Sequence, residues 1–211
     1  AAFAAFGVAA LAGLVLAATT TWWLVGVGAA AIAAAWFYTG GPKPYGYLGL
    51  GEVFVFVFFG LVATAGTTFV MIERLTGLAV AAAIPVGLLA VALLVVNNLR
   101  DIPTDAVSGK RTLAVRLGDG RTRRYFDTLM FAAFAVPVAL AVFHGLGPAV
   151  VAVLFAVPFA LDPGRAIAGG VHGRALNKVL GQVARLQVVY AFWLSAGLIA
   201  DRLLVTWLAG G

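Results

Sequence analysis

Cysteine is absent from this 211-residue chain, and histidine occurs only twice. The absence of cysteine excludes a disulfide framework, a thiolate nucleophile and a zinc site built on cysteine. Charged residues are also scarce, at 10% of the chain against about 25% in ordinary soluble domains, whereas 63% of the residues are hydrophobic. This composition excludes a soluble globular domain and indicates an integral membrane protein.

Hydrophobic segments of near-spanning length recur along the whole chain. A helix needs about 20 apolar residues to cross a hydrocarbon core of about 30 Å. Small residues that allow close helix packing are abundant in these segments. We therefore expect an all-α, polytopic membrane helix bundle of seven transmembrane helices, forming a single domain over residues 1–211. The predicted spans are 1–18, 22–39, 53–72, 78–96, 128–143, 148–161 and 186–208, with a turn at Gly145, Gly147 and Pro148.

The basic residues are distributed unevenly between the predicted loops. If all seven segments cross, the loops 40–52, 97–127 and 162–185 lie on one side and hold twelve of the 14 Lys and Arg residues. Because positively charged loops stay in the cytoplasm, this asymmetry predicts a multi-pass protein of the cell membrane with three cytoplasmic loops. The net charge of +6 would favour nucleic acid in a soluble protein, but here it predicts contact with the lipid bilayer and no nucleic acid.

The densest group of charges follows the fourth segment. Asn97, Asp101 and Asp105 are four residues apart, so on a helix their oxygen-bearing side chains lie along one face. Pro103 could end or bend this helix, which would leave Asp105 in the following turn. Two neighbouring carboxylates repel each other unless a cation lies between them. Mg²⁺ is suitable, because it binds one or two carboxylates and completes its shell with water and phosphate oxygens.

Basic residues beside this acidic group suit the phosphate charge. Arginine binds phosphate as a bidentate fork and lysine as a point charge. Together with the carboxylates they predict a metal–diphosphate site at the membrane surface. A solvated loop that obeys the positive-inside rule explains the same spacing equally well. The basic residues concerned are Arg100, Lys110, Arg111 and Arg116.

A second polar stretch lies before the third segment. It is typical of a cytoplasmic turn with tyrosine at the membrane interface. It also offers Lys43 for phosphate, and the rings of Tyr45 and Tyr47 for stabilising positive charge. Glu52, at the mouth of the third segment, is either an ordinary interface residue or part of the site.

Other polar residues near the spans are predicted to have ordinary surface roles. His172 has no second metal ligand at a suitable spacing and is expected to be a plain loop residue, as is His144. Flanking anchors are expected at Arg121, Arg123 and Arg124, and an amphipathic surface stripe at Asn177, Lys178, Gln182 and Arg185.

Three blocks of the sequence resemble the UbiA family of intramembrane prenyltransferases, and in particular its branch that prenylates 1,4-dihydroxy-2-naphthoate in menaquinone synthesis. The first is the run from Asn97 to Gly118, NNLRDIPTDAVSGKRTLAVRLG, which is similar to the family's second aspartate-rich motif. The second is the run from Thr39 to Phe59, TGGPKPYGYLGLGEVFVFVFF. The third is Gly173-Arg174-Ala175-Leu176, which resembles the family's last loop.

This resemblance implies a nine-helix bundle in which two aspartate-rich motifs bind a polyprenyl diphosphate through Mg²⁺. It implies that Asp101 and Asp105 are catalytic metal ligands supported by Asn97, and that Lys110 and Arg116 contact the diphosphate. The implied acceptor is 1,4-dihydroxy-2-naphthoate, whose prenylation with loss of the carboxylate gives demethylmenaquinone. The simplest alignment makes this chain helices three to nine, so we expect the first two helices and the first motif to be absent.

Three other functions compete with this interpretation. Another aromatic prenyltransferase of the same family would use the same residues. A CDP-alcohol phosphotransferase would show a D-G-x-x-A-R run before its aspartates, which this sequence lacks. A transporter or channel would carry ionisable residues deep inside its spans, whereas the charges here lie almost entirely in loops.

Overall fold

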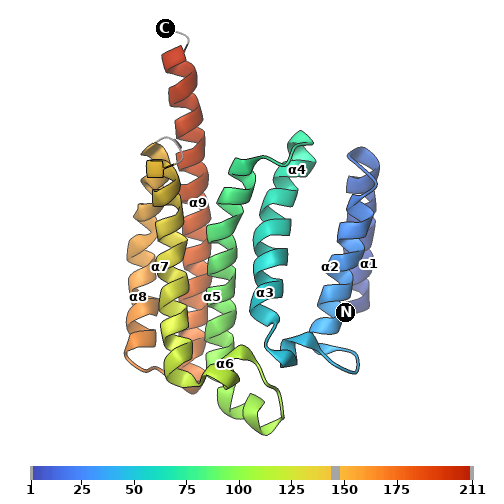
Figure 1. Cartoon of the computed structure of the whole chain (residues 1–211), viewed down its shortest axis with the longest axis vertical. Coiled ribbons are helices and arrows are strands. Elements are labelled where there is room, and N and C mark those ends of the chain that lie inside the picture. The colour runs from blue at the N-terminus through green and yellow to red at the C-terminus, as the bar shows by residue number, and fades with distance from the viewer. Residues whose placement is uncertain (1, 144–147, 210–211) are drawn as a thin grey trace.

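The computed structural model describes residues 2–143 and 148–209, and within these ranges the chain forms helices and turns without any strand. The elements are arranged as an elongated bundle (Figure 1). In chain order they are α1 (Ala2–Thr19), α2 (Leu24–Thr39), η1 (Tyr45–Leu48), α3 (Gly51–Val55), η2 (Phe56–Ala65), α4 (Gly66–Ile72), α5 (Gly77–Val107), α6 (Leu113–Leu117), α7 (Asp119–Phe143), η3 (Pro148–Ala156), α8 (Val157–Ala168), η4 (Gly173–Ala175) and α9 (Leu176–Ala209).

The predicted hydrophobic segments all fall on these helices. Five stretches are long and apolar enough to cross a membrane, namely Gly51–Ile72, Gly77–Val107, Asp119–Val142, Val150–Ala168 and Gly173–Trp207. Two shorter apolar helices, Phe3–Thr19 and Leu24–Thr39, account for the first two predicted segments. The prediction of an all-α, polytopic membrane helix bundle is therefore confirmed. The predicted turn at Gly145 and Gly147, and His144, lie outside the described residues.

Successive membrane-length segments run in alternating directions. The connections within 40–52, 97–127 and 162–185 consequently meet at one end of the bundle, near α6 in Figure 1. We refer to this end as the motif end. The grouping of the three basic loops that the charge pattern predicts is thus confirmed as an arrangement in space.

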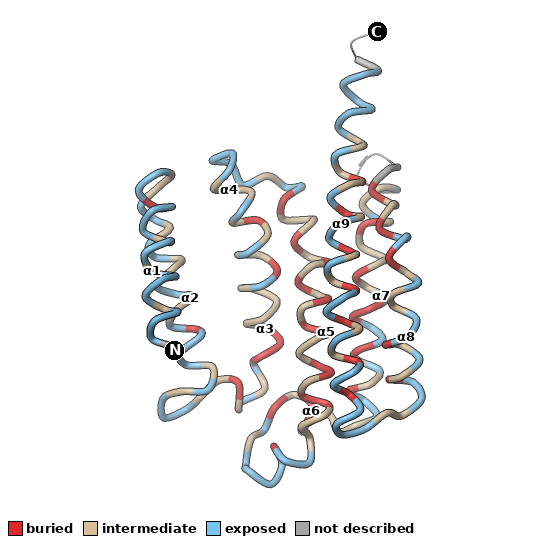
Figure 2. The backbone as a smooth tube through the Cα atoms, turned by 180° about the vertical axis from the view of Figure 1, so that it is seen from behind, coloured by how far each residue is buried: buried red, intermediate tan, exposed pale blue. Residues whose placement is uncertain are grey.

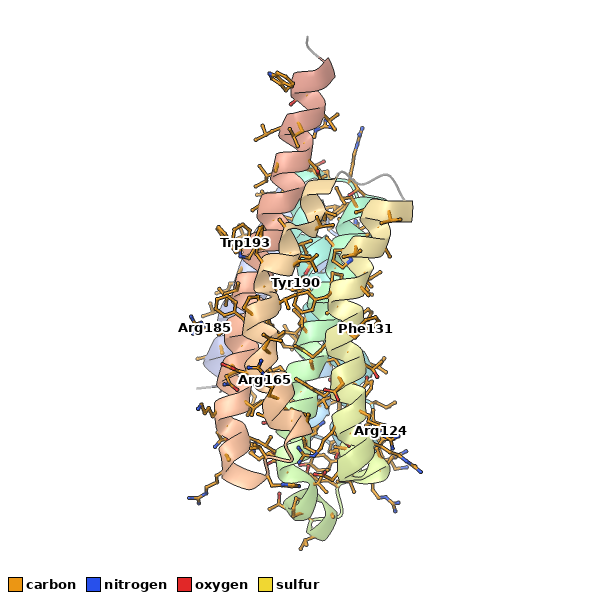
Figure 3. The ribbon with its side chains drawn as sticks, turned by 90° about the vertical axis from the view of Figure 1, so that its left-hand side faces the viewer. Arg124, Phe131, Arg165, Arg185, Tyr190 and Trp193 are labelled. Carbon is orange, nitrogen blue, oxygen red and sulfur yellow. The ribbon has the colours of Figure 1, made fainter. Side chains whose placement is uncertain are left out.

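The core lies between α5, α7, η3 and α9. Phe126, Leu186 and Tyr190 are fully buried there, and the Tyr190 hydroxyl donates a hydrogen bond to the carbonyl oxygen of Ala133. Figure 2 shows buried positions concentrated on these helices, whereas α1 and α2 are mostly exposed. In Figure 3 Tyr190 lies between α9 and α7, while Phe131 lies on an outer face. A bundle with apolar side chains on its outside is expected for a protein whose solvent is lipid.

Two glycines allow a close contact between neighbouring helices. A Cβ atom on Gly60 would lie only 2.6 Å from the Cα atom of Gly87, which no real side chain tolerates. The contact joins η2, a π-helical stretch, to α5. Because lipid gives little hydrophobic drive for helix association, such backbone proximity is a major source of packing between membrane helices.

The predicted loops are shorter in the structure than hydropathy suggests. Residues 97–107 are helical and belong to α5, α7 begins at Asp119 instead of 128, and α9 begins at Leu176 instead of 186. Hydropathy detects only the part of a helix that lies in lipid. At 1.5 Å per residue α5 is about 46 Å long, which exceeds a hydrocarbon core of about 30 Å. Its last turns therefore extend past the apolar core at the motif end.

Candidate active site

Asn97, Asp101 and Asp105, which we call the acidic group, lie on the last turns of α5. Contrary to the expectation for Pro103, the helix neither ends nor releases Asp105 into a turn there, and it continues to Val107. Pro103 is exposed, so its ring meets lipid or solvent instead of a packed neighbour. The helical spacing predicted for Asn97, Asp101 and Asp105 is therefore confirmed. Asn97 and Asp101 are half-buried, and Asp105 is 7% exposed.

Arg100 holds Asp101 as a bidentate partner. Its Nε and Nη2 atoms each lie 2.7 Å from one carboxylate oxygen of Asp101. Nη2 also donates to Oδ1 of Asn97 at 2.9 Å, and Nη1 donates to Oδ1 of Asn177 at 2.8 Å. Arg100 thus connects the acidic group of α5 with the start of α9, beside the third sequence block.

Lys110 is the basic neighbour of Asp105. Its ammonium lies 3.3 Å from Oδ1 of Asp105 and 4.9 Å from the centre of the Tyr47 ring. The hydrogen bond to Asp105 raises the pKa of Lys110 above its ordinary value. The chain turns back at this point, because the backbone N–H of Lys110 donates to the carbonyl oxygen of Asp105 at 2.9 Å. Each acidic side chain therefore has its own basic neighbour.

The first two resembling blocks are in direct contact. The backbone N–H of Arg111 donates to the carbonyl oxygen of Tyr47 at 2.9 Å, and Nε of Arg116 donates to the carbonyl oxygen of Arg111 at 3.0 Å. Gly49 has a φ of 75° and faces the same carbonyl of Arg111, where a Cβ atom would lie 3.3 Å away. The loop after α5 therefore rests on η1.

The remaining residues of the polar stretch before α3 point in different directions. The Tyr45 hydroxyl donates to the carbonyl oxygen of Ala34 at 2.7 Å, and its ring stacks on Phe54 with centroids 3.8 Å apart. Tyr45 is thereby fixed against α2 and α3. Lys43 is exposed, and within the described ranges it makes no ion pair or hydrogen bond. The structure brings Tyr47 to the acidic group but does not bring Lys43 there.

Glu52 is buried at the start of α3, at 5% exposure. Its Oε1 accepts a hydrogen bond of 3.1 Å from Nδ2 of Asn98, the neighbour of Asn97 on α5. Its Oε2 is buried and has no hydrogen-bond partner among the described residues. An interface residue exposed to headgroups is therefore excluded for Glu52. No sequence pattern singles out Asn98, whose partner lies 46 positions away.

Two apolar cavities flank the helix formed by α3 and η2. One, of about 590 Å³, lies between this helix, α5 and α9; Asn97 and Gln187 are among its lining residues. The other, of about 660 Å³, lies between η2 and α2 and is rich in aromatic side chains, including Tyr45 and Phe54. We call the first the Asn97 cavity. Asn97, one helical turn before Asp101, is thus at the wall of an otherwise largely apolar cavity.

Arg123 is an exception to its expected role as a flanking anchor. It pairs with Asp119 at 2.7 Å, and it donates to the carbonyl oxygens of Ile167 at 2.8 Å and Val171 at 3.0 Å. Asp119 also lies 3.2 Å from Nε2 of His172. Arg123 is therefore a structural connection between the start of α7 and the end of α8.

The donor set near Asp101 is compatible with magnesium. The two carboxylates and the amide oxygen of Asn97 lie on one helix face. All three are hard oxygen ligands, the kind that Mg²⁺ prefers. No group of three or more His, Cys, Asp or Glu residues converges within the described ranges, so phosphate and water oxygens would have to complete the shell. Arg100 and Lys110 already balance the two carboxylates and would have to move if a metal bound there.

Comparisons with known proteins show that the chain is similar to several prenyltransferases. The chain is 44% identical over 203 residues to the 1,4-dihydroxy-2-naphthoate octaprenyltransferase of Mycobacterium tuberculosis, an alignment covering 96% of this chain and 68% of that protein. It is 37% identical over 174 residues to the protein of the same name from Haemophilus influenzae, covering 82% and 56%. It is 27% identical over 168 residues to UbiA prenyltransferase domain-containing protein 1 of Homo sapiens, covering 80% and 48%.

The chain therefore spans about half to two thirds of the length of these relatives. No solved structure matches it. Residues 1–163, which include both η1 and the whole acidic group, match the UbiA prenyltransferase family. The chain belongs to the UbiA prenyltransferase family.

Proposed function

We propose that this chain transfers a polyprenyl group from a polyprenyl diphosphate to 1,4-dihydroxy-2-naphthoate, with loss of the ring carboxylate as CO2, to give demethylmenaquinone in its reduced, quinol form. The observation that carries the proposal is the apolar cavity that Asn97 lines, one helical turn before Asp101 on α5. A polyprenyl diphosphate has the same division into a charged head and a long apolar tail. The names of the bacterial relatives supply the aromatic acceptor.

The diphosphate would be held at the motif end. Asp101 and Asp105 would bind Mg²⁺ with support from Asn97, and the ion would supply electrostatic stabilisation of the charge that develops on the departing diphosphate. Arg100 and Lys110 would move from the carboxylates to the diphosphate oxygens, because a phosphate carries more negative charge than the carboxylate each one now pairs with. Arg111 and Arg116 lie on the same loop and extend the basic surface.

The bundle would contribute by positioning the prenyl tail and by excluding water. The apolar walls of the Asn97 cavity would align the tail, with the allylic carbon next to the acidic group. The departing pair of electrons goes to the diphosphate, and the electron-rich naphthoate ring attacks the allylic carbon. Water would quench this electron-poor carbon, so a dry apolar cavity favours transfer over hydrolysis. The motif end would face the cytoplasm of a cell membrane, as its basic loops predict.

The proposal is tested by binding and by product analysis. We expect the protein in lipid nanodiscs to bind geranylgeranyl diphosphate only when Mg²⁺ is present, and to form prenylated, decarboxylated naphthoate detectable by mass spectrometry. Asp101→Asn and Asp105→Asn should abolish both signals while the protein remains inserted. Asp127→Asn is the matched control, since Asp127 is exposed on α7 at the same end of the bundle.

Two results would contradict the proposal. Binding that is equally tight after chelation of Mg²⁺ would exclude the metal–diphosphate site. Wild-type-like turnover in either aspartate variant would exclude these carboxylates as ligands.

A further inference from the structure

A separate polar cavity opens on the outer surface of α8 and α9. It has a volume of about 210 Å³ and is lined by Pro158, Phe159, Asp162, Gln182 and Arg185. On α9 the Asn97 cavity is lined by Gly181 and Ala184 instead, so the two cavities lie on different faces of this helix. Figure 3 views the bundle from this side, with Arg185 on α9 and Arg165 on α8. We call it the outer cavity.

The outer cavity contains one cation, one anion and one unsatisfied acceptor. The guanidinium of Arg185 lies 4.9 Å from the centre of the Phe159 ring. Within the described ranges no ion pair joins Arg185 to Asp162. The Oε1 atom of Gln182 is buried and has no hydrogen-bond partner in the same ranges. A buried acceptor without a donor is unfavourable, so a ligand that brings an N–H group to Gln182 would be stabilised.

The outer cavity lies at the level where phospholipid headgroups begin. The hydrophobic segment 148–161 ends next to Asp162, and the segment 186–208 begins next to Arg185. Toward the interior of the membrane, the neighbouring surface of both helices is apolar and exposed, at Phe155, Leu161 and Val188. Acyl chains can therefore lie along α8 and α9 while the headgroup enters the cavity. Basic pockets between membrane helices on the cytoplasmic side bind lipid headgroups.

We propose that the outer cavity binds the phosphoethanolamine headgroup of an aminophospholipid. The phosphate would pair with Arg185, and the ammonium would pair with Asp162 and donate to Oε1 of Gln182. A headgroup with a single negative charge leaves the Asp162 carboxylate without a cation. A quaternary ammonium headgroup supplies a cation but has no N–H group for Gln182. The cavity therefore fits a primary ammonium better than either alternative.

Native mass spectrometry of the detergent-solubilised chain tests this selectivity. Phosphatidylethanolamine, phosphatidylcholine and phosphatidylglycerol with identical acyl chains are added separately, and bound lipid is counted. We expect phosphatidylethanolamine to bind about tenfold more tightly than the other two, which corresponds to about 1.4 kcal/mol. Arg185→Gln should weaken its binding about tenfold. Lys178→Gln is the matched control, because it removes the same charge from the same helix outside the cavity.

Asp162→Asn separates headgroup recognition from general attraction to charge. It should weaken phosphatidylethanolamine binding about tenfold and leave phosphatidylglycerol binding unchanged or stronger, which also shows that the variant is folded. Equal binding of all three lipids would overturn the proposal. So would an equal loss in Lys178→Gln and Arg185→Gln, since that result indicates attraction to the basic surface as a whole.

Discussion

Glu52 and Asn98 form a buried hydrogen bond of 3.1 Å that joins α3 to α5 next to the acidic group. Both side chains are almost completely removed from solvent. Such a pair fixes the rotation of one helix against the other, because an apolar contact has no comparable directional preference. It therefore helps to determine the direction in which the aspartates of α5 point.

Asn98→Leu should destabilise the bundle more than loss of an ordinary side chain. The substitution leaves a buried carboxyl group without a donor, which costs about 1–3 kcal/mol. The melting temperature should fall by about 2–4 °C for each kcal/mol, as measured by thermal unfolding in detergent. The double variant Glu52→Leu/Asn98→Leu should recover part of this loss, because replacing both partners leaves no unsatisfied group. Additive destabilisation would contradict the role given to this pair.

Gly60→Ala should disrupt the contact between η2 and α5. The new Cβ atom would lie 2.6 Å from Cα of Gly87, so the two helices must separate. Gly66→Ala is the matched control on the same membrane span, because nothing lies within 4 Å of its Cβ position. The control should be neutral or stabilising by up to about 1 kcal/mol, since alanine is the better helix former. Similar melting temperatures for the two variants would show that the close contact is unimportant.

Arg100→Gln should make Asp101 more accessible to a free divalent cation. Arg100 occupies both carboxylate oxygens of Asp101, so its removal takes away a competing positive charge. We expect Mn²⁺, used as a paramagnetic substitute for Mg²⁺, to bind several-fold more tightly without diphosphate, as measured by electron paramagnetic resonance. Arg116→Gln is the control, because Arg116 bonds a backbone carbonyl instead. Weaker Mn²⁺ binding in Arg100→Gln would contradict competition for Asp101.

Lys110 should remain protonated to a higher pH than an unpaired lysine. Its pKa is raised above 10.5 by Asp105, so the stabilisation from this pair is complete below that pH and is lost as the pH rises through the folded-state pKa. The pair is partly exposed and contributes less than about 1 kcal/mol. At pH 9 to 10, acylation of Lys110 should lag behind that of Lys178, measured by peptide mass spectrometry. Asp105→Asn should abolish the difference, and a faster reaction of Lys110 would be contrary to this assignment.

Hydropathy and charge were sufficient to predict where the spans lie and which loops share one end. Hydropathy and charge depend on local composition, and each of the seven segments is strongly apolar. Helix ends were less predictable. The polar start of α9 looks like a loop by hydropathy, yet Val179 and Val183 are buried there and keep the helix intact.

The contacts of the site depend on tertiary structure that no local pattern reveals. The spacing of Asp101 and Asp105 predicts a shared helix face, but it does not show that Arg100 reaches Asn177, 77 positions away. Asn98 is also hidden from sequence patterns, since one amide at the end of an apolar run has no distinctive spacing. The interpretation of Arg123 was wrong for a similar reason, because its carbonyl partners, at the end of α8 and just after it, lie 44 and 48 positions away.

The unbroken course of α5 through Pro103 has a mechanical consequence. Gly87, at the contact with η2, and both aspartates belong to one stiff rod. When the bilayer becomes thicker or thinner, membrane helices change their tilt, and a rod of this length moves its far end furthest. The proposed diphosphate binding should therefore respond to the acyl-chain length of the surrounding lipid.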